Sequence, residues 1–220
     1  MKKYKIIVVG MLLICLAFIL YFAYKYRVFN QSIHYANEFG FEDIISPNDY
    51  DQDGIDDYSD VVEGARNYIA SKPKYKSKYY AGGYPDDQYG VCTDVIWNAL
   101  LSAGYDLKTA IDLDIQNNLI DYPTITYPDS NIDFRRVSNL AIFFSKYATS
   151  LTTDITEIEQ FMPGDIIIFK DHIGILSDKR NADGLPFVIH HDSLGARERN
   201  ELDIYEIIAH YRITNPFIIE

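Results

Sequence analysis

The sequence predicts an α+β fold, and two patterns along the chain carry this prediction. From about residue 60 to about residue 147, apolar residues recur at helical spacing. From Pro163 onward, short apolar runs alternate with turns rich in Asp, Asn and Gly, which is typical of an antiparallel meander. Helices followed by a sheet indicate an α+β domain. About 190 residues follow the apolar N-terminus, which suits one globular domain.

The apolar N-terminal segment predicts a transmembrane anchor within residues 1–29. Ile6 to Tyr24 are almost continuously apolar, and about 19 residues can cross a ~30 Å hydrocarbon layer as a helix. A cleaved signal peptide is the main alternative, but its apolar region usually has about 7 to 15 residues and ends in small residues. Aromatic residues follow here, and Cys15 lacks the small neighbours of a lipoprotein signal. We therefore expect an uncleaved anchor.

Basic residues around this segment predict its orientation. Lys2, Lys3 and Lys5 precede it, whereas only Lys25 and Arg27 follow. Because cytoplasmic flanks carry the excess of Lys and Arg, the N-terminus is expected in the cytoplasm. The sequence thus predicts a single-pass protein of the cell membrane whose domain is extracytoplasmic.

The rest of the chain is strongly acidic. Five of the 20 basic residues and none of the 32 acidic ones lie before position 30, which leaves a formal charge of about −17 on the residues from position 30 onward. Nucleic-acid affinity depends on Lys and Arg that displace counterions, so a nucleic-acid partner is excluded. Such a charge tolerates bound cations.

After a polar stalk at residues 30–48, an acidic loop at residues 49–60 predicts a structural calcium site. Acids occupy loop positions 1, 3, 5, 9 and 12 and glycine occupies position 6, which is the calcium-loop spacing. The loop departs from the EF-hand pattern at its eighth and twelfth residues and looks more like the short loops of thrombospondin-type and dockerin-type proteins. A solvated acidic linker is the alternative. The expected ligands are Asp49, Asp51, Asp53, Ile55, Asp57 and Asp60.

The chain beyond the loop predicts four helices and four strands. Ser59 is expected to cap the first helix, and Gly104 to end the second, which begins near Cys92. The remaining helices are expected at about residues 107–116 and 136–147. The strands are expected at 166–169, 172–176, 187–190 and 204–213.

Cys92 is the first candidate catalytic residue. The only other cysteine lies in the apolar segment, so Cys92 has no disulfide partner in the domain. A free cysteine is usually a small buried hydrophobe. At the first turn of a helix, however, the sulfur would feel the positive end of the helix dipole, which favours the thiolate. The charge of Asp94, two residues on, would oppose this effect.

A nucleophile needs a base, and two histidines are the candidates. His172 opens a predicted strand, and His190 lies on the next one, from which it could orient the first imidazole. Side chains alternate faces along a strand, so His190 and His191 cannot both face one site. Arg135 and Arg136 could hold an anionic substrate, although ion pairing is the commoner role.

These residues resemble a known family. Gly90-Val91-Cys92, Gly164-Asp165 with the apolar run after it, His172-Ile173-Gly174-Ile175 and Val188-Ile189-His190 are similar in order and spacing to NlpC-type cysteine peptidases of bacterial cell walls. Over about residues 59–213 the chain more closely resembles the YijF-like domain family of unknown function. Two departures leave the substrate open: Thr93-Asp94 replaces the usual Ser-Gly, and the interval from Cys92 to His172 is long.

The resemblance implies a papain-like NlpC-type fold at residues 59–220, with Cys92 as nucleophile, His172 as base and His190 as its partner. It places Tyr79 near the substrate, and we expect Asp94 there as well. The predicted function is a cysteine hydrolase, amidase or endopeptidase, that acts on peptidoglycan or cell-wall peptides without a catalytic cofactor. A calcium-stabilised binding module without hydrolytic activity and a transpeptidase of the same fold are the alternatives.

Overall fold

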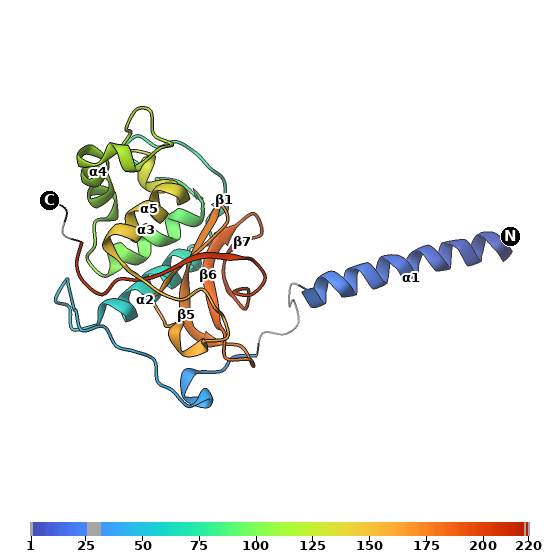
Figure 1. The fold of residues 1–220 in the computed structure, drawn as a ribbon. Helices are drawn as coiled ribbons and strands as arrows, with labels where there is room; N and C mark the ends of the chain where they lie inside the picture. Colours follow the sequence, from blue (N-terminus) through green and yellow to red (C-terminus); the bar gives the residue numbers. More distant parts are fainter. Residues whose placement is uncertain (1, 26–31, 218, 220) are drawn as a thin grey trace.

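The computed structural model describes residues 2–25, 32–217 and 219. It confirms a mixed α+β domain with an antiparallel sheet, preceded by an apolar helix (Figure 1). The helices are α1 (Lys2–Lys25), α2 (Asp57–Ala70), α3 (Cys92–Ser102), α4 (Leu107–Asn117) and α5 (Val137–Tyr147). Short 3-10 turns are η1 (Ala36–Phe39), η2 (Leu119–Asp121), η3 (Asp133–Arg135) and η4 (Ile158–Gln160).

The sheet has six strands in the order β3-β8-β4-β5-β6-β7. Its strands are β3 (Thr149–Ser150), β4 (Ile166–Phe169), β5 (His172–Arg180), β6 (Pro186–Asp192), β7 (Gly195–Arg199) and β8 (Ile207–Arg212), all paired antiparallel. Strands β4, β5 and β6 follow the predicted meander, and β7, which was not predicted, extends it. The fourth predicted strand, β8, instead returns to pair with β4. A separate pair, β1 (Lys74–Tyr75) and β2 (Tyr89–Gly90), is parallel.

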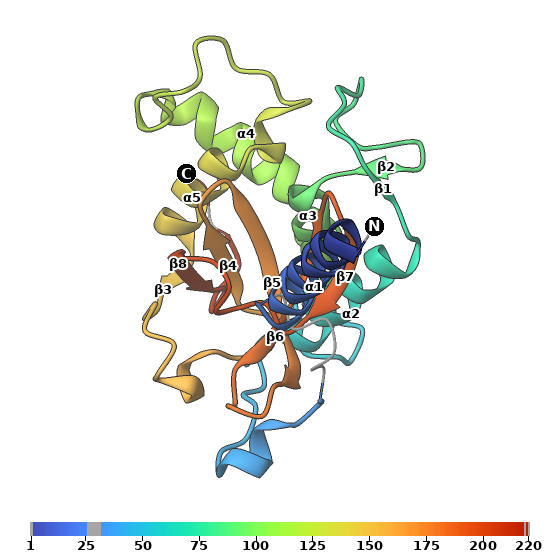
Figure 2. The same ribbon diagram turned by 90° about the vertical axis from the view of Figure 1, so that its right-hand side faces the viewer.

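Helices α2 to α5 cover one face of the sheet, as the two views in Figures 1 and 2 show. Because successive side chains of β5 point to opposite faces of the sheet, they belong to two different cores. Ile173 and Ile175 belong to the larger core, together with Cys92 and the buried faces of α2, α3, α4 and α5. Leu176 belongs to a smaller core on the opposite face, beneath the loops that flank η4 and β8. His172, two positions before Gly174, therefore lies on the face away from the helices.

Local chemistry sets the beginning of helix α2. Asp56, rather than the predicted Ser59, is its N-cap, and the Asp56 carboxylate accepts a hydrogen bond from the Tyr58 amide. Ser59 lies inside the first turn and donates its hydroxyl to Asp56 at 2.6 Å. The positive end of the helix dipole also stabilises a carboxylate at this position.

The Gly164-Asp165 turn holds the sheet against α2 and β8. Gly164 has a φ of +82°, and a Cβ there would lie 3.1 Å from the Tyr58 backbone, so glycine is required. The fully buried Asp165 carboxylate accepts hydrogen bonds from Arg212 at 2.7 Å and contacts His210 at 2.8 Å. These bonds fix β8 beside β4.

Helix α1 is long and apolar enough to cross a membrane. Its window from Ile7 to Tyr24 has a mean hydropathy of 2.6, and none of that window is covered by the rest of the chain. A chain segment of this kind is a membrane-anchor candidate by length and composition. Met1 and residues 26–29 of the predicted anchor, and residues 30 and 31 of the predicted stalk, lie outside the described residues.

Candidate active site

Cys92 is the first residue of α3 and is almost fully buried, with 6% of its surface exposed. Burial raises the pKa of the Cys92 thiol to about 11, although hydrogen bonds from the Ile173 and Thr93 backbone lower it. The charge of Asp94 adds to the rise. The helix dipole alone would lower the pKa of Cys92. The pKa is raised instead, because the cost of burying a thiolate exceeds the stabilisation that the helix dipole gives it. Cys92 is therefore a neutral thiol at pH 7.

A chain of hydrogen bonds links two histidines to a carboxylate. His172 Nε2 lies 2.8 Å from His190 Nδ1, and His190 Nε2 lies 2.8 Å from Glu201 Oε2. Arg197 donates a further hydrogen bond to Glu201 at 3.0 Å. Both His190 and Glu201 are buried. The predicted pairing of His172 with His190 is thus present, and Glu201 extends it by one member that sequence reasoning missed.

The proton positions in this chain follow from Glu201. Although its burial works in the opposite direction, the hydrogen bond from His190 and the charge of Arg197 lower the pKa of Glu201. As a carboxylate, Glu201 only accepts, so His190 donates from Nε2. In a neutral ring His190 Nδ1 then accepts, and His172 donates from Nε2. The unprotonated nitrogen of His172 is consequently Nδ1.

The backbone of β5 connects this chain to Cys92. The Cys92 sulfur accepts a hydrogen bond from the backbone of Ile173, the residue next to His172. Burial, and then the charge of His190, lower the pKa of His172 to about 4, so its imidazole is neutral at pH 7. A neutral thiol thus lies beside the strand end that carries a neutral imidazole. This is the protonation state in which an imidazole can act as a general base.

A cavity of about 370 Å³ opens at His172. Its walls come from the β4–β5 turn, the end of β6 and the segment before β8. The lining residues are Phe169, Lys170, His172, Asp192, Tyr205 and Glu206. The cavity is lined by two aromatic rings and by charges of both signs, and Cys92 is not among the residues that line it.

The structure corrects the expectation that Asp94 binds substrate. Asp94 is fully buried, and its carboxylate pairs with Arg135 through two hydrogen bonds of 2.7 and 2.8 Å. It also accepts from Trp97 Nε1 at 2.9 Å and from the Val91 amide at 2.8 Å. Both carboxylate oxygens are thus occupied inside the protein. Asp94 therefore holds the first turn of α3 in place, and Arg135 has the core ion pair that sequence reasoning gave as its commoner role.

Tyrosines other than Tyr79 lie near the thiol. Tyr79 is 60% exposed, and its hydroxyl donates to Asp129 at 3.0 Å. Burial is the first cause of the raised pKa of both Tyr68 and Tyr75, and a thiolate at Cys92 would add to the rise. Both rings lie against His191, and the Tyr68 hydroxyl is 2.8 Å from His191 Nδ1. As expected from strand alternation, His191 faces away from the His172 and His190 pair.

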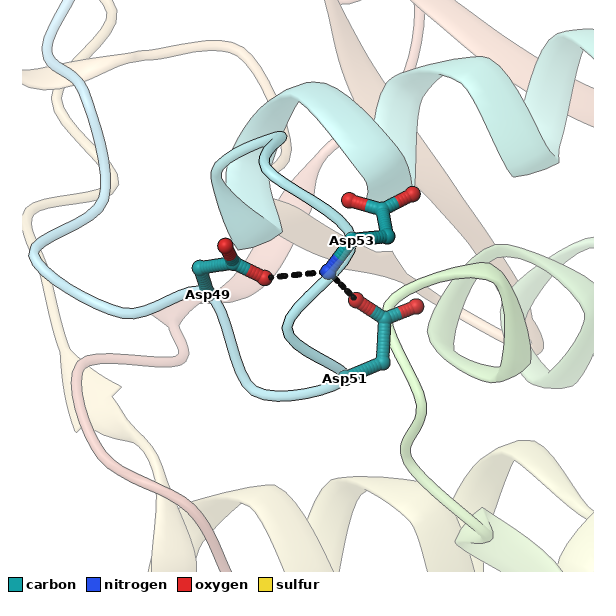
Figure 3. A group of neighbouring side chains, drawn as sticks. All are labelled: Asp49, Asp51 and Asp53. Atoms are coloured by element: carbon teal, nitrogen blue, oxygen red, sulfur yellow. Dashed lines mark hydrogen bonds between the residues drawn. The ribbon is translucent and has the colours of Figure 1, made fainter.

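The acidic loop brings three of its predicted ligands together. Side-chain oxygens of Asp49, Asp51 and Asp53 lie within 4.8 Å of one another (Figure 3). Neither Asp60 nor Asp57 belongs to this group, and the oxygens of Asp57 are bonded elsewhere, which corrects the predicted ligand set. The Asp57 carboxylate is buried, accepts the Tyr50 amide at 2.8 Å, and accepts the hydroxyl of Tyr105.

Comparison with known proteins identifies the class of domain. The chain belongs to the family described as Domain of unknown function (DUF1287), which matches residues 62–213. It is similar to the uncharacterized protein YijF of Escherichia coli (strain K12), with 36% identity over 164 residues that cover 69% of this chain and 80% of that protein. No solved structure matches the chain. The predicted YijF-like resemblance is therefore confirmed.

Proposed function

We propose that this protein is a membrane-anchored cysteine hydrolase of NlpC-type, papain-like fold, with Cys92 as nucleophile and His172 as general base. One observation carries the proposal: the thiol at the start of α3 is hydrogen-bonded by the backbone beside His172, and His172 heads a chain to His190 and Glu201. A cysteine hydrolase requires a thiol and a histidine base that a third group orients. Here the thiol lies at a helix start, and the oriented histidine lies at the end of the strand that contacts the thiol, on the opposite face of the sheet.

The first half of the reaction forms a thioester. As Cys92 Sγ bonds to an amide carbon, its proton moves to His172 Nδ1 by way of a water molecule at the end of β5, because the His172 ring lies on the face of the strand away from α3. No free thiolate is then needed before substrate arrives. The negative charge on the carbonyl oxygen is held by backbone N–H groups at the start of α3, which point toward the sulfur in the free protein. His172 then gives the proton to the leaving amine as the C–N bond breaks.

The second half of the reaction uses water as the acceptor. His172 takes a proton from water as the water oxygen attacks the thioester carbon, and the proton returns to Cys92 Sγ when the C–S bond breaks. His190 and Glu201 keep the ring orientation and the Nδ1 lone pair through both halves. The carboxylate of Glu201 also stabilises the transient imidazolium through His190.

Cell-wall peptide is the substrate class that fits the surroundings. With α1 in the cytoplasmic membrane and its basic N-terminus inside, the domain faces the wall on the extracytoplasmic side. The cavity at His172 contains Lys170 and the acids Asp192 and Glu206, which complement the carboxylates and amines of stem peptides. We place the activity as an amidase or endopeptidase on peptidoglycan peptides.

Digestion of purified peptidoglycan tests the proposal. Full-length protein in detergent micelles is incubated with peptidoglycan, and new amine ends and released fragments are followed by mass spectrometry. Wild type should release fragments, and Cys92→Ala should release none above the level of a protein-free control. Equal release by both proteins, or release by neither, would overturn the proposal.

A surface-binding module without hydrolytic activity is the second candidate, and the burial of Cys92 favours it. A thiol that is 6% exposed with a pKa of about 11 is also what a structural cysteine shows. Sedimentation with insoluble peptidoglycan separates the two functions. A binding module would sediment with the wall and leave it uncut, and Cys92→Ala would bind equally well.

A further inference from the structure

A second set of chemically reactive groups lies at the other end of α3, in the loop at residues 49–60. Figure 3 shows the carboxylates of Asp49 and Asp51 directed at the backbone nitrogen of Asp53, from which both accept a hydrogen bond, with the Asp53 carboxylate on the other side of that nitrogen. Their oxygens lie within 4.8 Å of one another, a separation that one ion with bonds of about 2.4 Å can bridge. All three carboxylates are exposed to solvent. A cluster of exposed acids does not by itself indicate an ion.

Asp60 supplies an independent observation. It is 4% exposed, and within the described part of the chain its Oδ2 is buried without a hydrogen-bond partner. The charges of Asp53 and Asp51 act on this carboxylate more strongly than those of its helix neighbours Asp57 and Asp56. A buried carboxylate oxygen without a partner costs free energy, and nearby negative charges increase that cost. The group therefore lacks a positive partner.

No basic side chain of the described residues supplies that partner. Among the ion pairs that these residues form, none includes Asp49, Asp51, Asp53 or Asp60. The other acids nearby have different tasks: Asp56 caps α2, and Asp57 is hydrogen-bonded to Tyr50 and Tyr105. Asp49, Asp51 and Asp53 also accept backbone amides of the loop, but no positive charge neutralises their carboxylates or that of Asp60.

We propose that this loop binds one calcium ion through the carboxylates of Asp49, Asp51, Asp53 and Asp60, with the backbone carbonyl of Ile55 at loop position 7 as a further ligand. Oxygen ligands of this number and charge suit calcium, whose coordination of six to eight oxygens is completed by water. The ion provides the positive charge that Asp60 lacks. This inference is independent of the proposed hydrolase activity.

The ion would fasten the loop onto the end of α3. Gly104, which follows α3, has a φ of +79°, and a Cβ there would lie 2.9 Å from Asp51 Cβ. The ring of Tyr50 stacks on Tyr105 with centroids 4.6 Å apart. Calcium therefore joins the segment that leads from the N-terminal helix to the turn after α3. Cys92 lies at the opposite end of that helix, so the ion has a structural role.

Calcium titration of the full-length protein in detergent micelles tests the site. Isothermal titration calorimetry should show one calcium site in the range of about 10⁻⁴ to 10⁻³ M or tighter. Asp51→Asn should lose this binding, whereas Asp86→Asn, which removes an exposed carboxylate outside the loop, should retain it. Absence of binding in wild type, or unchanged binding in Asp51→Asn, would overturn the site. An equal response to magnesium would overturn the assignment to calcium.

Thermal unfolding gives a second readout that does not depend on heat of binding. Wild type should melt several degrees higher in calcium than in chelator, because the ion binds only the folded loop. Asp60→Asn should melt at or above wild type in chelator, since it removes an unpaired buried charge, and should gain less than half of the wild-type increase in calcium. A variant that is destabilised equally in both conditions would contradict the proposal.

Discussion

The two ends of helix α3 differ in how their charges are neutralised. At its first residue the charged groups and the histidine pair have partners from the protein itself: Asp94 has Arg135, His172 has His190, and His190 has Glu201. Beside its last turn the carboxylates of Asp49, Asp51 and Asp53 lie together, Asp60 Oδ2 is buried without a hydrogen-bond partner, and none of the four has a basic partner among the described residues. One end is completed by the chain, and the other needs an ion.

The difference shows how burial and charge determine chemistry. Desolvation keeps both Cys92 and His172 neutral at the first end, so the proposed nucleophile and base are ready to exchange one proton. At the second end, Asp49, Asp51 and Asp53 are exposed to solvent, where a cation can enter, and Asp60 is buried. Because the two ends are completed in different ways, a change at either end should leave the other unaffected.

The largest effect is expected from His172→Ala. Loss of the general base should lower kcat/KM on peptidoglycan fragments by about 100- to 10,000-fold. His191→Ala is the matched control, because His191 lies on the same strand as His190 but faces Tyr68. The control should lose less than about tenfold, since His191 takes no part in the proposed proton transfer. Fragment release measures both variants. A larger loss in His191→Ala than in His172→Ala would assign the base to His191, on the opposite face of the sheet.

Asp94→Asn should cause the largest loss of stability. It leaves Arg135 buried without its charged partner, which costs about 3 to 5 kcal/mol in the free energy of unfolding. The double variant Asp94→Asn with Arg135→Met should recover part of this loss, because no buried charge remains. Chemical denaturation measures both. A double variant that is less stable than the single one would contradict the proposed cause.

Glu201→Gln should have an intermediate effect on activity. An amide at this position could donate as well as accept, so it would no longer fix the tautomers of His190 and His172. Outer partners that orient a histidine commonly contribute about 10- to 100-fold. We expect a loss of that size in kcat with KM nearly unchanged. Calcium-dependent melting should stay at the wild-type value, since Glu201 is at the other end of α3.

The smallest effect concerns the Cys92 thiol in the free protein. Its folded pKa of about 11 lies above the unfolded value near 9, so between these pH values the unfolded thiol loses its proton first. The contribution of Cys92 to folding stability is therefore present below pH 9 and falls as pH rises toward 11. The difference in ultraviolet absorbance between wild type and Cys92→Ser measures the thiolate at position 92. At pH 7 this difference should show no thiolate. A thiolate at pH 7 would contradict the neutral pair.

Much of the fold could be predicted from the sequence because it depends on local periodicity. The predicted second helix agrees with α3, which begins at Cys92, and the fourth agrees with α5 to within one residue. Strand β7 escaped prediction because Gly195–Arg199 has no apolar alternation, and its residues pair with β6 while Glu198 bonds Arg66. The pairing of β8 with β4 could not be predicted either, because it joins residues far apart in the sequence and no local pattern indicates it.

The candidate site was only partly predictable for the same reason. His172 and His190 begin and end apolar runs, which made them visible, but Glu201 lies in a turn with no pattern around it. The pairing of Asp94 with Arg135 joins residues 41 positions apart. The pKa of Cys92 depends on how deeply α3 packs, which spacing does not reveal.

Trapping the thioester tests the central claim most directly. Full-length protein is mixed with soluble peptidoglycan fragments, quenched in acid within seconds, and digested for mass spectrometry. The account predicts an acyl adduct on the peptide that contains Cys92, absent in Cys92→Ala, and accumulating with Glu201→Gln if that variant slows hydrolysis of the thioester. Fragment release without any adduct on Cys92, and at the same rate in Cys92→Ala, would contradict it.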